Sequence, residues 1–264
     1  MKDCEDFAEH EGLSSIVSHP IDVTLPAPIF RCADGGLDMA VTARYAEYVA
    51  GTWVERVVVA GPVGAGEFCT GDQRAAVVAL WARHRPPEHL IVACWERHEV
   101  DRALERGMRA LVMLRCETDD ALFNALAALP AGAIAYTNPR YSRAVLTATV
   151  IDEARRRGVL PAAVKLSKVS LAELAEVRAV GGTDLEIVHG SSRDLAGSLA
   201  AGVNVVVSSP LAALPQPWPA RTLDAVQHAA DQVQRILDRQ VDHRGRVAMI
   251  GRLAERVVAL DRHS

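Results

Sequence analysis

Residues 56–94 read RVVVAGPVGAGEFCTGDQRAAVVALWARHRPPEHLIVAC and contain a strand pattern, a helix pattern and a second strand pattern in succession. The runs at 56–61 and 90–94 are β-branched and apolar without strict alternation, which is typical of parallel strands that are buried on both faces. Residues 71–85, between them, are rich in Ala, Leu and Arg and favour a helix. The stretch therefore predicts one strand–helix–strand unit.

The same succession continues on both sides of this unit. Strand patterns occur at residues 23–30, 56–61, 90–94, 110–114, 133–138, 162–167, 185–190 and 203–209. Helix patterns follow them at residues 37–51, 71–85, 98–107, 118–129, 142–158, 170–181, 193–202 and 222–240, and a further one at 247–260 ends the chain. Eight strand–helix repeats favour a closed (β/α)8 TIM barrel over an open doubly wound sheet. No G-x-G-x-x-G follows the first strand, which argues against a dinucleotide-binding sheet.

The chain has 264 residues, which suits one barrel domain. We expect an N-terminal arm at residues 1–22, the barrel at 23–245 and a C-terminal helix at 246–264 packed on the barrel. The formal net charge is −4 and no dense Lys/Arg stripe occurs, so no nucleic-acid partner is expected.

Cysteine usage and hydropathy indicate the compartment. The five cysteines are scattered and form no C-x-x-C pair, which is typical of free thiols in a reducing compartment. The first twelve residues are acidic and polar, unlike a signal peptide. No apolar run approaches the ~20 residues of a membrane span. We therefore expect a cytoplasmic protein without a membrane partner.

The active site of a (β/α)8 barrel lies at the carboxyl ends of its strands, and Lys165 falls there within AAVKLS. Strand geometry puts Lys165 and Ser167 on one face. If that face is the barrel axis, burial disfavours the charged amine, and a neutral amine attacks ketones. The alternative is a lysine that extends to solvent at a strand end. Tyr136 lies at the same depth on the preceding strand, where it is either a proton shuttle or a core aromatic.

Three further features lie at strand ends. The glycine-rich turn at residues 61–67 includes Gly64, Ala65 and Gly66, whose amides can converge on an anion such as a carboxylate. His189 ends the seventh strand pattern. It is either a ligand contact or merely a polar residue at the barrel mouth. No H-x-H, H-E-x-x-H or carboxylate cluster is present, so neither a metal nor a cofactor is expected.

Five segments of the sequence carry a family resemblance: APIF with DGGLD at 34–38, VVVAGPVGAGEF at 57–68, AYTNPRY at 135–141, AAVKLS at 162–167 and LEIVHGSSRDL at 185–195. Together they resemble the Schiff-base aldolase family of dihydrodipicolinate synthase and N-acetylneuraminate lyase. The resemblance extends from about residue 25 to about residue 210.

The resemblance implies that Lys165 forms an imine with pyruvate or another 2-oxo acid. The imine would act as an electron sink for making or breaking a C–C bond, with Tyr136 as proton shuttle. Amides near Ala65 and Gly66 would hold the substrate carboxylate, and Arg140 would hold a distal anionic group. A small-molecule substrate is then the expected partner, and the family's habit predicts a homo-oligomer, either a dimer or a tetramer.

The sequence also departs from the family pattern. Gly64 and Ala65 stand where the family has paired hydroxyl residues, and Arg115-Cys116-Glu117 stands where it often has Pro-Tyr-Tyr. Both changes remove proton-relay partners and favour a reaction other than dihydrodipicolinate formation.

Two alternatives to a divergent aldolase or lyase stay open. One is a non-catalytic barrel that binds a ligand or a partner protein, which the loss of the loop hydroxyls favours. The other is an enzyme without a Schiff base that binds phosphate at the turns after the last strands, for example at residues 189–192 before a helix start.

Overall fold

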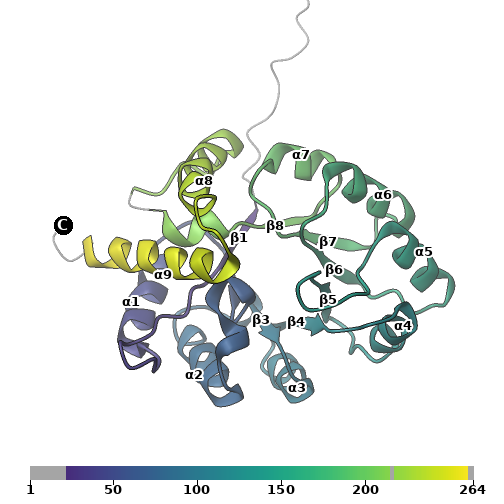
Figure 1. The fold of residues 1–264 in the computed structure, drawn as a ribbon, viewed down its shortest axis with the longest axis horizontal. Coiled ribbons are helices and arrows are strands. Elements are labelled where there is room, and N and C mark those ends of the chain that lie inside the picture. The colour runs from purple at the N-terminus through teal and green to yellow at the C-terminus, as the bar shows by residue number, and fades with distance from the viewer. Residues whose placement is uncertain (1–21, 215–216, 261–264) are drawn as a thin grey trace, which may run out of the picture.

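The computed structural model describes residues 22–214 and 217–260. The expected N-terminal arm, except for Asp22, lies outside the described residues. Eight parallel strands form a closed barrel in which each strand pairs with its neighbours in chain order and β8 pairs with β1. The helices surround this barrel (Figure 1). The predicted (β/α)8 barrel is confirmed.

The strands are short, and each lies within or beside its predicted run. They are β1 (Val23–Pro26), β2 (Arg56–Val59), β3 (Leu90–Cys94), β4 (Arg109–Leu114), β5 (Ile134–Thr137), β6 (Ala163–Leu166), β7 (Glu186–His189) and β8 (Val205–Val207). The α-helices are α1 (Met39–Ala50), α2 (Gly71–Trp81), α3 (Arg97–Glu105), α4 (Asp119–Ala127), α5 (Ala148–Arg156), α6 (Leu171–Gly181), α7 (Leu195–Ala200), α8 (Leu223–Leu237) and α9 (His243–Leu260). Short 3₁₀ turns are η1 (Pro62–Gly64), η2 (Gly66–Phe68), η3 (Pro87–His89) and η4 (Ser209–Ala213).

Helix starts follow ordinary capping chemistry. The Thr70 and Ser170 side chains each accept a hydrogen bond from the backbone amide three residues on, and their own backbone amides donate to the side-chain oxygens of Gln73 and Glu173. The last helix, α9, begins at His243 and packs against α1 and η4, across the side of the barrel that β1 and β8 close (Figure 1).

Alternation along the strands divides the core into two clusters. Outward-facing side chains pack beneath the helices in the larger cluster. Inward-facing side chains fill the bore in a second cluster that includes Val58, Leu111, Ile134, Tyr136 and Val207. The bore is therefore a packed core, and only its two ends are open to chemistry.

Charged pairs occupy the amino-terminal end of the barrel. Arg109 at the start of β4 makes a two-pronged ion pair with Glu186 at the start of β7, with N–O distances of 2.8 and 2.7 Å. Arg56 at the start of β2 pairs with Asp22 at 3.0 Å. These ion pairs are part of the barrel floor, so the loops at the carboxyl ends are left to form the site.

Candidate active site

Lys165 and Tyr136 are register partners on β6 and β5 at the carboxyl end of the barrel. Both are buried, with 6% and 3% of their surface exposed. The Lys165 Nζ atom lies 4.1 Å from the centre of the Tyr136 ring, and Lys165 makes no ion pair with a carboxylate of the described residues. The sequence-based pairing of these two side chains is thus present in the structure.

The Tyr136 hydroxyl lies in a hydrogen-bonded group. Asn138 Nδ2 donates to it at 2.8 Å, and Ser167 Oγ lies 3.2 Å away, where either oxygen can donate. Burial by itself raises the pKa of this phenol. The charges of Lys165 and Arg140 and the hydrogen bonds from Ser167 and Asn138 outweigh burial and bring the pKa of Tyr136 below its ordinary value. The phenol is therefore suited to give up and take back a proton.

Gly190, directly after β7, gives this group its space. A Cβ built on Gly190 would lie 2.3 Å from Ser167 Oγ and 3.4 Å from Lys165 Cε. A side chain at this position would displace Ser167, so glycine is required by close approach rather than by backbone conformation.

The glycine-rich turn after β2 is a compact pair of 3₁₀ turns. The amides of Gly64, Ala65 and Gly66 each donate to a carbonyl of the same turn, at 3.0, 3.2 and 3.0 Å. Gly66 has no room for a side chain, because a Cβ there would lie 1.8 Å from the Ala60 carbonyl oxygen. In this conformation the three amides predicted to hold a carboxylate are engaged within the turn itself.

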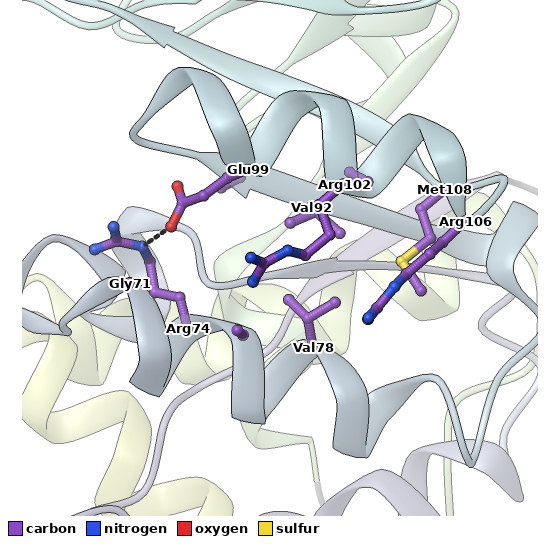
Figure 2. A pocket seen from close by; sticks show the side chains of 11 residues that line it. Gly71, Arg74, Val78, Val92, Glu99, Arg102, Arg106 and Met108 are labelled. Atoms are coloured by element: carbon purple, nitrogen blue, oxygen red, sulfur yellow. Dashed lines mark hydrogen bonds and ion pairs between the residues drawn. The ribbon is translucent and has the colours of Figure 1, made fainter.

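A buried ion pair fixes this turn to the next strand–helix connection. Arg74 on α2 donates to Glu99 Oε1 at 2.7 Å and also to the carbonyls of Gly66 and Cys69. The second oxygen of Glu99 accepts from the Trp95 amide at 2.7 Å. Figure 2 shows this pair among the side chains that line a pocket. The pocket lies between α2 and α3 and has a volume of about 30 Å³, which has room for a water molecule but not for a substrate.

A second polar group crosses the mouth of the barrel. Glu67 Oε1 accepts from the Tyr141 hydroxyl at 2.9 Å and lies 3.3 Å from His243 Nε2 at the start of α9. Burial opposes the Glu67 charge, but His243, the residue's own amide and Tyr141 together lower the pKa of Glu67. The Tyr141 ring packs edge-on against Trp95, with centroids 5.5 Å apart. This group ties together the loops after β2 and β5 and helix α9.

Two predicted contacts lie apart from the Lys165 group. Arg140 is exposed at the rim, with its guanidinium 5.9 Å from the Tyr141 ring centre. His189 is in register with Leu166, and both face the helix layer rather than the bore. Its Nδ1 lies 2.9 Å from Ser198 Oγ on α7. The structure therefore places His189 outside the candidate site.

Sequence reasoning did not single out Asn138, Gly190 or Lys168 as site residues. Asn138 stands in the segment AYTNPRY, and Lys168 follows Lys165 by three residues, so the sequence pattern could have indicated both as site residues. Gly190 was not, because its role depends on the approach of β6 to β7. Residues 22–214 and 217–260 contain no group of three potential metal ligands, and no helix in them has the length and apolar character of a membrane span.

The fold and this group define a (β/α)8 barrel whose buried lysine and tyrosine lie at the carboxyl ends of neighbouring strands. No protein-family model and no curated protein sequence matches the chain. Solved structures do match it in fold. Dihydrodipicolinate synthase from Agrobacterium tumefaciens has a TM-score of 0.72 at 18% identity, covering 89% of this chain and 88% of the other.

Two further structures match comparably. A variant of Sulfolobus solfataricus 2-keto-3-deoxygluconate aldolase, in complex with L-2-keto, 3-deoxy-galactonate, has a TM-score of 0.68 at 11% identity, with 90% and 86% coverage. Dihydrodipicolinate synthase from Thermotoga maritima has a TM-score of 0.63 at 16% identity, with 83% and 82% coverage. The resemblance found in the sequence is thus matched by the fold of these structures.

Proposed function

We propose that this chain is a divergent member of the dihydrodipicolinate synthase-like aldolases that makes or breaks a bond in pyruvate or another 2-oxo acid through an imine at Lys165. One observation carries the proposal: a buried Lys165 amine, unpaired with any described carboxylate, against Tyr136. The solved structures that match the fold include a dihydrodipicolinate synthase and a 2-keto-3-deoxygluconate aldolase.

The use of lysine in this chain supports the proposal. Only three of its 29 basic residues are lysines, namely Lys2, Lys165 and Lys168. A guanidinium replaces an ammonium in most charge roles, but it cannot form an imine with a ketone. A primary amine at this buried position in the bore therefore supports a chemical role for Lys165 rather than a role for its charge alone.

The reaction balances with groups present in the site. The Lys165 amine adds to the C2 carbonyl through its nitrogen lone pair, and a proton reaches the carbinolamine oxygen from Tyr136 as water leaves. The resulting imine accepts the electron pair released when the C3–C4 bond breaks, while Tyr136 takes the proton of the C4 hydroxyl. Protonation at C3 and addition of water at C2 then release the 2-oxo acid and restore the amine. Bond formation is the reverse.

Ser167 and Asn138 supply the proton path on this proposal. The hydroxyls that the family carries after its second strand are replaced here by Gly64 and Ala65. Ser167 Oγ instead lies beside the Tyr136 hydroxyl from β6, and Asn138 holds the phenol oxygen from the other side. The relay is thus moved from the loop after β2 to the neighbour of the reactive lysine.

A second candidate, a barrel that binds a ligand without catalysis, is favoured by one observation. The amides of Gly64, Ala65 and Gly66 donate within their own turn, so a substrate carboxylate has to share or replace those bonds. The phosphate-binding alternative has less support, because Asp194 caps α7 and accepts from the Gly197 amide.

The test is borohydride trapping with pyruvate, read by intact mass and by peptide sequencing. We expect one adduct, located on Lys165, that is absent from Lys165→Arg and kept in the matched control Lys2→Arg. The three lysines make the assignment unambiguous. An adduct-free wild-type protein, with pyruvate and with larger 2-oxo acids, would contradict the aldolase proposal and favour the non-catalytic barrel.

A further inference from the structure

The loop after β2, residues 60–67, carries backbone strain at two alanines. Ala60, directly after the strand, and Ala65, between η1 and η2, both have a φ of 59°. This is the left-handed region that residues with a Cβ rarely adopt, because the Cβ comes too close to a carbonyl oxygen. A fold keeps such a conformation only where the surrounding contacts fix it, and strain of this kind is concentrated at functional sites.

The turn at Ala65 directs three consecutive amides back into the loop. Ala65 ends η1 and precedes η2, and its amide donates to the Pro62 carbonyl at 3.2 Å. The amides of Gly64 and Gly66 both donate to the Gly61 carbonyl, at 3.0 Å. Each amide has one hydrogen, so a carboxylate can receive a full hydrogen bond from these amides only if the bonds within the loop are given up.

Two glycines allow the loop to lie this close to the strand ends. A Cβ built on Gly64 would lie 2.4 Å from the carbonyl oxygen of Ala27, which directly follows β1, and one built on Gly66 would lie 1.8 Å from the Ala60 carbonyl oxygen. Neither glycine has a positive φ, so space and not backbone conformation requires glycine here. A side chain at either position would hold the loop away from the strands.

Contacts from the neighbouring connection keep the strained loop in place. The Trp95 indole donates to the Ala60 carbonyl at 2.9 Å, and Arg74 donates to the Gly66 carbonyl at 3.4 Å. Both donors are buried, and Arg74 is itself fixed by its ion pair with Glu99. These bonds accept the loop in its present form and offset the strain at its two alanines.

The loop also has space into which it can move. A cavity of about 350 Å³ lies beside Ala65 and Phe68, and its other walls include Val41 of α1 and Val247 of α9. The Phe68 side chain is 53% exposed, so it is not part of the packed core. Residues 61–66 can therefore move away from the strand ends without displacing a strand.

We propose that the loop after β2 is autoinhibitory: its closed form, seen here, withholds the three amides, and the substrate carboxylate binds only after the turn at Ala65 opens. The inference rests on the proposed imine at Lys165, because the carboxylate is that of the 2-oxo acid. Opening relieves the strain at Ala65 and exchanges three neutral hydrogen bonds for stronger bonds to a charged acceptor. The apparent affinity is then reduced by the fraction of molecules whose loop is open.

Two substitutions shift this equilibrium in opposite directions. Gly64→Ala adds a Cβ that meets the Ala27 carbonyl only in the closed loop, and Ala65→Gly relieves the strain of that form. We expect half-maximal borohydride trapping at about fivefold lower pyruvate concentration for Gly64→Ala and about fivefold higher for Ala65→Gly. Gly251→Ala is the matched control, because nothing lies within 4 Å of its added Cβ, and it should leave the concentration unchanged.

Hydrogen exchange of the peptide that contains residues 60–68 tests the closed loop without substrate. Amides that are bonded within a stable turn exchange slowly. Exchange should therefore be faster in Gly64→Ala and slower in Ala65→Gly than in the wild-type protein. Faster exchange in Ala65→Gly would show that glycine merely loosens the loop, and it would overturn the inference.

Calorimetry with pyruvate in a Lys165→Met background separates this inference from the function on which it rests. This variant cannot form an imine, so binding reports the carboxylate contact alone. Tighter binding with Gly64→Ala and weaker binding with Ala65→Gly support the autoinhibitory loop whether or not the wild-type protein is trapped. Equal binding in all three backgrounds would overturn it and leave the imine to be decided by trapping. Should Gly64→Ala not fold, the comparison of Ala65→Gly with its parent decides in the same way.

Discussion

The amine of Lys165 lies over the ring of Tyr136, 4.1 Å from its centre, while the Tyr136 hydroxyl is directed to Ser167 and Asn138. The lysine thus contacts the face of the phenol and the relay contacts its oxygen. On the proposed mechanism this geometry separates the nucleophile from the proton path, and it allows each to be removed without the other.

Replacing Tyr136 with Phe should slow imine formation and keep the fold. The variant retains the ring beside Lys165 and loses only the hydroxyl, so we expect the rate of adduct formation with pyruvate to fall by about 10²–10⁴-fold. The measurement is a quenched-flow time course of trapping, with circular dichroism to check folding. An unchanged rate would show that the phenol is a packing residue.

Gly190→Ala should slow imine formation by steric displacement of a neighbouring side chain, without removing any catalytic group. The new Cβ would lie 2.3 Å from Ser167 Oγ and would displace it. The hydrogen bond between the Ser167 and Tyr136 hydroxyls would then be lost. Gly251→Ala in α9 is the matched control, because nothing lies within 4 Å of its added Cβ. We expect slower trapping in the first variant and wild-type trapping in the second. Equal rates in both would remove Gly190 and Ser167 from the mechanism.

His189 should make the protein less stable as the pH falls from about 6.5 to about 4. Burial lowers the pKa of His189 to about 4. Ser198 Oγ donates to the Asp194 carbonyl at 2.7 Å, so His189 Nδ1 is the donor to Ser198 and Nε2 is left as an acceptor, buried and without a partner. The folded protein therefore resists protonation at Nε2.

The sign of this effect follows from proton binding. Below about pH 6.5 the unfolded chain protonates this histidine and the folded chain does not, so stability falls until the folded form also protonates near pH 4. The full difference is about 3 kcal/mol. Urea unfolding at pH 7 and pH 4 should show this loss in the wild-type protein beyond that in His189→Leu. Parallel losses in the two proteins would refute the assignment.

The ion pair at the barrel floor should contribute to stability and not to chemistry. Arg109 and Glu186 are each about 30% exposed, and their two hydrogen bonds join strands on different sides of the bore. A double-mutant cycle with Arg109→Met and Glu186→Gln should give a coupling free energy of about 1–3 kcal/mol. The exposed pair Arg156–Asp152 on α5 is the control, with about 0.5 kcal/mol expected. Similar coupling in both pairs would contradict this role.

The barrel and the central pair of the site could be predicted from the sequence because both depend on local patterns. Buried parallel strands such as β2 show as apolar runs, and the position of a residue on its strand places Tyr136 and Lys165 at the mouth. Strand ends were predicted too long in most cases, since residues such as Gly61 and Gly190 continue the pattern after the ladder ends. The assembly state, predicted as a dimer or tetramer, stays a prediction.

The rest of the site depends on contacts between distant segments. His189 was expected at the mouth, but one step of strand alternation turns it toward Ser198. The Glu67 contacts with Tyr141 and His243 join loops 74 and 176 residues apart, and nothing in the local pattern of any one of them signals the other two.

The charged floor of the barrel has a consequence for how such a protein can change over evolutionary time. The Arg109–Glu186 and Arg56–Asp22 pairs hold one end of the bore closed without drawing on any residue of the opposite end. Mutations that exchange one substrate for another at the mouth therefore do not weaken these anchors. Related proteins with this barrel can therefore change substrate specificity at the mouth while these two ion pairs continue to stabilise the fold.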